Sequence, residues 1–135
     1  MRRLYLLVVL ALAVTLLAAC GGGASTTGTG STGGGGDVNA GKALFAQQTI
    51  GSNVGCITCH SLDGSELVGP SMQGIGARAG KEVQGQSAEQ YIRNSIVEPN
   101  SHAAEGYATG VMPGYQGVVS DTQLNDLVAY LLSLK

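Results

Sequence analysis

The amino-acid sequence predicts an all-α domain, because its clearest local patterns are helical and no stretch alternates apolar and polar residues as a strand would. Two segments begin with a capping box, in which a serine is followed three residues later by a glutamine. After the second box, apolar residues recur at the i, i+3, i+4, i+7 spacing that buries one face of a helix. These residues are Leu124, Leu127, Val128 and Leu131.

Three helices are expected in the chain. The first runs over residues 38 to about 48, and the carboxylate of Asp37 can accept its first free amide protons. The second follows the capping box that starts at Ser87 and ends before Pro99, because proline cannot continue a helix. The third follows the box that starts at Ser120 and carries the apolar stripe.

The two long segments between these helices are expected to be loops. Residues 64–81 are rich in glycine and contain Pro70, which argues against both helix and strand. Residues 100–119 form a second segment without a helical pattern. A long ordered loop in a small domain is usually functional.

Length and charge set further limits. The 135 residues suit a single folded domain, taken as residues 37–135. This part contains five lysines and arginines against nine carboxylates, so it is acidic and has no basic stripe, which excludes nucleic-acid binding. The chain has one phenylalanine, five tyrosines and no tryptophan, so an internal cofactor would supply apolar volume that its side chains lack.

Residues 1–19 are interpreted as a lipoprotein signal peptide. Arg2 and Arg3 are followed by an apolar run over residues 4–17, about the length of a signal-peptide core. Leu17-Ala18-Ala19-Cys20 resembles the lipobox of bacterial lipoproteins, in which the signal is removed and the cysteine receives lipid. The alternative is an uncleaved anchor helix. Both interpretations tether the domain to the outer face of the cytoplasmic membrane, on the periplasmic or extracellular side.

A flexible linker is expected after Cys20. Residues 21–36 are glycine, serine and threonine with one alanine, a composition that forms a flexible coil and cannot pack. Residues 20–36 are therefore expected to be the lipidated cysteine followed by this linker. A coil of this length has a root-mean-square span of roughly 20–24 Å. It either lets the domain swing between membrane-bound partners or acts as a simple spacer.

Cys56-Ile57-Thr58-Cys59-His60 is the attachment signature of a c-type haem. Two thiols must reach the two vinyl groups of one porphyrin, and the two residues between them make a tight turn that sets their separation. The adjacent histidine then ligates the iron. Without His60, the Cys-x-x-Cys pair could also be interpreted as a thioredoxin-like dithiol or as half of a zinc site. The histidine, the export signal and the lack of another cysteine pair favour one covalent haem c.

The iron needs a sixth ligand, and the candidates are Met72, His102 and Met112. Met72 follows closely after Pro70 and is expected in the core on the side of His60. His102 has polar neighbours that indicate a solvated loop. Met112 is favoured, because the glycine and proline residues around it fix a bend that can present its side chain inward. An open sixth position is the remaining alternative.

From Asp37 to its end the chain resembles a class I cytochrome c. Gly41 and Phe45 match the first-helix residues that cross the terminal helix, and Leu127 and Tyr130 match their partners. The resemblance implies crossing N- and C-terminal helices with the haem in a loop-lined pocket.

The same resemblance implies roles for single residues near the haem. Residues 69–75 resemble the loop whose proline carbonyl accepts a hydrogen bond from the ligand histidine, so Pro70 is expected to orient His60. Arg78 matches an arginine that binds a haem propionate. The segment Met112-Pro113-Gly114-Tyr115 resembles a Met-Pro-x-aromatic motif of bacterial relatives, and this adds Tyr115 to the expected haem contacts.

Within this family, residues 91–112 look most like the cytochrome c domain fused to subunit II of haem-copper oxidases. No copper-binding domain is present in this sequence, so the resemblance implies only the electron-carrying module. The acidic balance also differs from the lysine-ringed docking face of mitochondrial cytochromes c.

The expected function is transfer of single electrons between membrane-bound redox complexes of a respiratory or photosynthetic chain, with His60 and Met112 on the iron. This is not an enzymatic role. The alternative is a haem-based sensor or small-ligand-binding module, which requires an open or displaceable sixth site. A peroxidase would need a second haem motif or a distal acid–base set, neither of which is evident.

Overall fold

The computed structural model describes residues 35–135. The predicted signal peptide, Cys20 and most of the linker lie outside these residues. Within residues 35–135, no helix is both long and apolar enough to cross a membrane.

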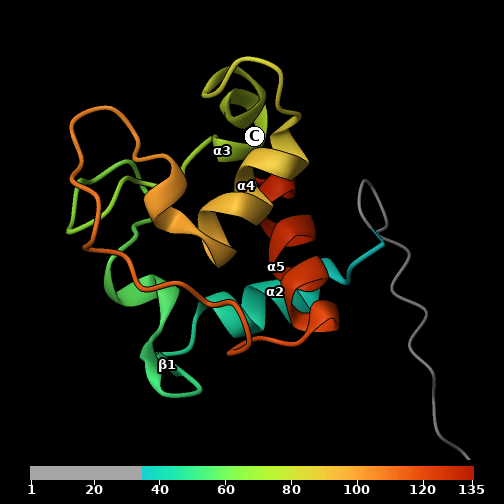
Figure 1. Cartoon of the computed structure of the whole chain (residues 1–135). Coiled ribbons are helices and arrows are strands. Elements are labelled where there is room, and N and C mark those ends of the chain that lie inside the picture. The colour runs from blue at the N-terminus through green and yellow to red at the C-terminus, as the bar shows by residue number, and fades with distance from the viewer. Residues whose placement is uncertain (1–34) are drawn as a thin grey trace, which may run out of the picture.

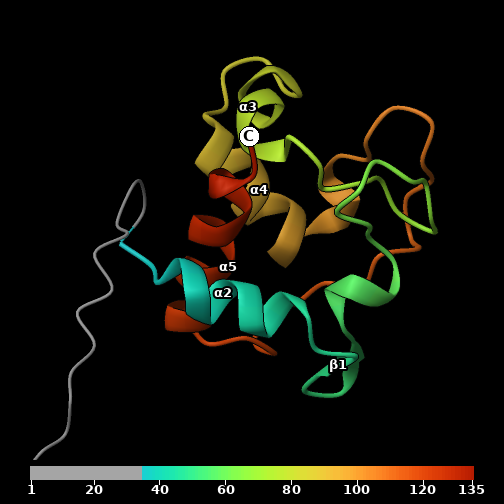
Figure 2. The same ribbon diagram turned by 180° about the vertical axis from the view of Figure 1, so that it is seen from behind.

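The described part of the chain consists of short helices, long connecting loops and one small hairpin (Figure 1 and, from behind, Figure 2). This arrangement confirms the predicted all-α class. The elements in chain order are α2 (Val38–Phe45), β1 (Thr49–Ile50), β2 (Asn53–Val54), the 3-10 helix η1 (Cys56–Thr58), α3 (Ile75–Arg78), η2 (Ala79–Lys81), α4 (Ala88–Val97), η3 (Pro99–Ser101) and α5 (Asp121–Ser133).

The predicted helix starts are present with their caps. Asp37 Oδ1 accepts hydrogen bonds from the amides of Asn39 and Ala40, at 2.7 and 3.1 Å. Both capping boxes are complete: each serine hydroxyl accepts a hydrogen bond from the amide three residues later, and that glutamine side chain accepts one from the serine amide. Local sequence therefore fixes where α2, α4 and α5 begin.

Helices α2 and α5 cross in close contact, as Figures 1 and 2 show. A Cβ atom on Gly41 would lie 1.9 Å from the carbonyl oxygen of Asp126, so only glycine allows the two backbones to approach this closely. The rings of Phe45 and Tyr130 meet with their centroids 5.6 Å apart. Leu127 is 1% exposed. The expected packing of these two helices is confirmed.

Helix α4 packs against α5 and completes the core. Ile92 and Ile96 are buried on its inner face. At its surface, Arg93 Nη2 donates to Asn125 Oδ1 at 2.7 Å, which links the two helices. Pro99 follows α4 and opens η3, as expected for a residue that cannot extend the helix.

The first helix was predicted to reach about residue 48, but it ends at Phe45. The chain then forms an antiparallel hairpin in which Thr49 pairs with Val54 and Ile50 with Asn53. Gly51 makes the turn with φ +58°. The sequence gives no sign of this hairpin, because two-residue strands are too short to show alternation.

The prediction that residues 64–81 are all loop was also wrong, since this segment ends in α3 and η2. Helix α3 is only four residues long and includes Gly76, whose Cβ atom would lie 2.2 Å from the carbonyl oxygen of Leu132. Packing against the end of α5 therefore stabilises this helix, although glycine has a low helical propensity. The other predicted loop is confirmed after η3, because residues 102–119 contain no helix or strand.

We expect Gly41→Ala to lower the free energy of unfolding by roughly 1–3 kcal/mol, because the added methyl group overlaps the Asp126 carbonyl group and pushes α5 away. Helix propensity alone predicts the opposite, a gain of about 0.5–1 kcal/mol. Chemical denaturation of the haem-loaded protein measures the difference. Gly80→Ala is the control, since a Cβ atom there has its nearest neighbour at 3.4 Å. A Gly41→Ala protein as stable as wild type would contradict this account of the crossing.

Candidate haem site

A cavity of 430 Å³ lies among η1, the loop that follows it, α4 and the loop before α5. Its walls are mostly apolar and include Phe45 and Leu127 from the helix crossing. A cavity of about 300–1,000 Å³ with apolar walls and a few polar groups is typical of small-molecule and cofactor sites. The helix crossing and the candidate site therefore share side chains.

Cys56, Cys59 and His60 reach this cavity together because the chain turns tightly between them. The amides of Cys59 and His60 both donate to the carbonyl oxygen of Cys56, at 3.1 and 3.0 Å. Gly55, directly before the turn, has no room for a side chain, since a Cβ atom would lie 1.7 Å from the Gln47 carbonyl oxygen. Both cysteines are half-buried and free of disulfides.

The pKa of the Cys56 thiol is raised to about 11, chiefly by burial. A backbone hydrogen bond opposes this increase, and the neighbouring Cys59 adds to it. Redox-active Cys-x-x-Cys pairs need a lowered pKa, because the thiolate is the nucleophile. A buried, protonated thiol argues against a thioredoxin-like site. It is compatible with a cysteine that forms a permanent thioether.

The His60 ring is fixed by its contacts. Its Nδ1 donates to the Pro70 carbonyl oxygen at 2.8 Å, so this tautomer leaves the lone pair on Nε2 for a metal. A Cβ atom on Gly69 would lie 2.5 Å from Cε1 of the ring, so the Gly69 backbone packs directly against the imidazole. Pro70 was predicted to contact His60, whereas the close contact of Gly69 was not, although the Gly-Pro pair is a signal for such a close turn.

All three candidate sixth ligands line the same cavity. Met72 is half-buried in the loop that also holds His60, and its amide donates to the Ser61 carbonyl oxygen at 2.8 Å. His102 is exposed, and its ring meets Tyr91 edge-on with centroids 5.9 Å apart. Met112 is half-buried in the loop before α5.

The Met112 loop is attached to the rest of the domain on both sides. The Tyr115 amide donates to the Ile96 carbonyl oxygen at 3.0 Å, which connects the loop to α4. The Tyr115 hydroxyl donates to the Val54 carbonyl oxygen, and Asn53 Nδ2 donates to the Gly114 carbonyl oxygen at 3.1 Å. The hairpin that the sequence analysis missed thus holds this loop. Tyr115 itself lines the cavity.

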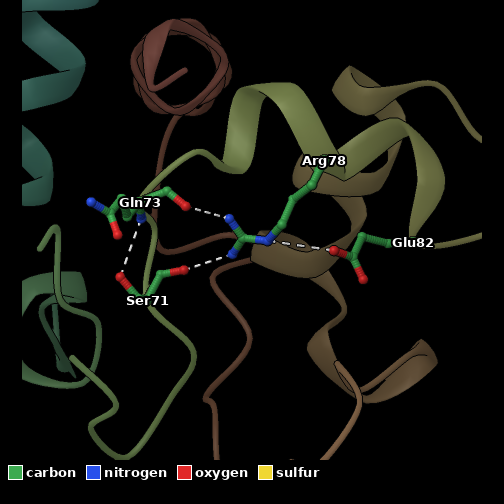
Figure 3. Close-up of polar contacts among 4 residues, drawn as sticks. All are labelled: Ser71, Gln73, Arg78 and Glu82. Carbon is green, nitrogen blue, oxygen red and sulfur yellow. Dashed lines mark hydrogen bonds and ion pairs between the residues drawn. The ribbon is translucent and has the colours of Figure 1, made fainter. Parts of the chain in front are cut away.

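Arg78 also lines the cavity, and its guanidinium group holds the backbone that follows Pro70 (Figure 3). It donates to the carbonyl oxygens of Ser71 and Gln73, both at 2.6 Å. Its Nε lies 3.5 Å from a carboxylate oxygen of Glu82. A guanidinium group has five N–H donors, so these contacts leave donors for a propionate. That role stays a prediction.

These features define a c-type haem protein: a small all-α domain with the attachment signature at an apolar cavity. The family model for Cytochrome c matches residues 38–135, and the chain therefore belongs to the cytochrome c family. A sequence comparison with curated proteins found no match. Members of this family carry electrons and bind haem c covalently, one per domain. The residues here fit that group, with two free thiols, an imidazole with Nε2 available, and apolar walls.

We expect Tyr115→Phe to lower the free energy of unfolding by about 1 kcal/mol at neutral pH, because it removes the hydrogen bond to Val54. Burial raises the pKa of Tyr115 to about 12, above its ordinary value of 10.0. The neutral ring thus stabilises the fold below pH 10, and this contribution is lost as the pH rises toward 12. The difference between wild type and variant should shrink over that range.

Denaturation at a series of pH values measures this difference. Tyr107→Phe is the control, since the Tyr107 hydroxyl makes no hydrogen bond within residues 35–135. A pH-independent difference between wild type and Tyr115→Phe would show that the phenol is not buried as described.

Proposed function

We propose that this protein is a membrane-tethered, mono-haem c-type cytochrome that carries single electrons between redox complexes of a respiratory or photosynthetic membrane. One observation carries the proposal: His60, fixed through Nδ1, and Met112 line the same cavity as both attachment cysteines. Two protein ligands on the iron leave no position for a substrate, which fits electron transfer rather than catalysis.

The bound haem supplies an iron centre that alternates between Fe(III) and Fe(II). Cys56 and Cys59 would hold it through thioether bonds, and His60 would ligate the iron through Nε2. The Pro70 carbonyl group fixes the ring orientation and raises the basicity of the imidazole. Ligation by the Met112 thioether together with apolar walls would favour the reduced state and raise the potential.

Met112 is the better sixth ligand for three reasons. Met72 lies in the loop whose Pro70 carbonyl group holds the His60 ring, so we expect its side chain on the side of His60. His102 is exposed and packs edge-on against Tyr91. Met112 is half-buried in a loop that hydrogen bonds attach to α4 and to the hairpin, so its position needs little reorganisation when the oxidation state changes.

The proposed tether joins the domain away from the two loops that line the cavity, residues 59–74 and 102–119, which we call the cavity loops. Gly36 lies against α5, where a Cβ atom would be 2.2 Å from the Asn125 carbonyl oxygen. In Figures 1 and 2 this end of the described chain and the two cavity loops lie on opposite sides of the domain. A lipid on Cys20, joined through the linker, would therefore leave the cavity side free to face partners at the outer membrane surface.

The sixth ligand is tested by substitution. Met112→Ala should abolish the sulfur-to-iron charge-transfer band of the oxidised protein and let carbon monoxide bind the ferrous form. Met112→His should keep a low-spin iron and lower the potential, because imidazole donates more strongly than a thioether. Absorption spectroscopy and redox titration measure both.

Two controls address the other candidates. Met72→Ala and His102→Ala should both keep the band. A band that survives in Met112→Ala would identify Met72 as the ligand. A wild-type protein without the band that binds carbon monoxide readily would favour the sensor alternative over the electron carrier.

Mass spectrometry of the intact mature protein tests whether Cys20 carries a lipid anchor. The mature protein should begin at Cys20 and carry acyl chains, because Leu17-Ala18-Ala19-Cys20 resembles a lipobox. A diacylated cysteine is expected, since a single chain anchors only weakly. Intact mass of detergent-extracted protein measures this, and Cys20→Ser should lose the added mass. A product that retains residues 1–19 and an unmodified Cys20 would instead be held by an anchor helix.

A further inference from the structure

Exposed apolar side chains gather where the cavity opens. The described residues contain five large apolar side chains that are exposed, and all lie on the hairpin or on the two cavity loops: Val54, Leu62, Leu67, Val68 and Val111. We call these five the mouth patch. Val68 and Val111, which are 60% and 55% exposed, also line the cavity, so they edge it from two separate loops.

Clustering of this kind is informative, because single exposed apolar residues are normal on any surface whereas grouped ones mark interaction sites. The two loops lie together on one side of the domain in both Figure 1 and Figure 2, as green and orange segments. The mouth patch therefore lies on the segments that border the cavity, and three of its members, Val54, Val68 and Val111, also line it.

The charged side chains on the hairpin and the two cavity loops all have one sign, and the nearest cation that lines the cavity, Arg78, is bonded to backbone carbonyl groups. The loops carry Asp63, Glu66 and Glu105, each of them exposed, and Glu105 lines the cavity. Neither of the stretches 43–77 and 94–134 contains a lysine or an arginine. The five cations of the described chain lie elsewhere, on α2, between residues 78 and 93, and at the C-terminus. Carboxylates are therefore the only charged side chains on the hairpin and the two cavity loops.

We infer that the mouth patch docks a redox protein whose own contact face is apolar at its centre and basic at its edge. This inference rests on the proposed electron-carrying function and specifies its partner. An apolar centre excludes water from the contact, while complementary edge charges steer and orient the encounter. A second copy of this chain does not fit, because two acidic edges would face each other and repel.

Two forms of one probe test the charge requirement. The reduced, haem-loaded full-length protein is mixed with oxidised mitochondrial cytochrome c, which has a lysine-ringed face, and with the same cytochrome after its lysines are succinylated. The bimolecular rate of electron transfer is measured by stopped flow at several salt concentrations. The native probe should react faster at low salt and slow as salt is added. The succinylated probe should show the opposite trend.

Charge reversal then locates the surface. Glu66→Lys and Glu105→Lys should each slow the reaction with the native probe by about threefold or more at low salt. Asp121→Lys makes the same change in net charge at the start of α5, outside the two loops, and should have a clearly smaller effect. Leu67→Ser should slow the reaction even at high salt, where the charges are screened, and leave the absorption spectrum and potential unchanged. Ala43→Ser on α2 is its control.

Each outcome has a distinct meaning. Equal rates for the two probes, or equal effects of Asp121→Lys and Glu66→Lys, would overturn the docking surface while leaving the electron carrier intact. A wild-type protein that cannot be reversibly reduced and oxidised by small reagents would overturn the proposed function itself. Sedimentation that reveals a dimer lost in Leu67→Ser would assign the mouth patch to a second copy and overturn the partner inferred here.

Discussion

The contact between the backbones of α2 and α5 at Gly41 sets the distance between the first and last helices of the domain. Phe45 and Leu127 lie at this crossing and also form part of the cavity wall. Any change in the separation of the two helices therefore changes the space for the cofactor. In a domain with so few aromatic side chains, the crossing and the cofactor together make one core rather than two.

Backbone carbonyl groups organise the loops around that core. A loop lacks the regular backbone hydrogen bonds of a helix or sheet, so its buried carbonyl groups must accept hydrogen bonds from side chains or from other backbone amides. The carbonyl of Pro70 accepts from His60, and those of Ser71 and Gln73 accept from Arg78. The three carbonyl groups are close together in the chain, so the Arg78 guanidinium group also stabilises the backbone that orients the His60 ring. A segment without regular structure thereby gains a defined shape.

Sequence reasoning succeeded where the cause of a structure is local. A capping box acts within one turn, so Ser87 and Ser120 correctly marked the starts of α4 and α5. It failed where the cause lies elsewhere in the chain. Gly76 is helical because its backbone packs against the end of α5, and the hairpin is stabilised by contacts with the Met112 loop. At the site, the attachment signature was evident in the sequence because its residues are consecutive. The contact between Gly69 and the His60 imidazole was not, because it depends on how the loop after His60 folds back onto the ring.

The residues that would set the potential and those that would select a partner occupy different environments. His60 and Met112 are half-buried, and contacts to backbone carbonyl groups fix their loops. Leu67 and Glu66 are exposed and contribute nothing to the cavity wall. Substitution at the exposed positions can therefore alter association while ligation stays the same. The mouth patch meets the cavity wall at Val54, Val68 and Val111, which are exposed and also line the cavity.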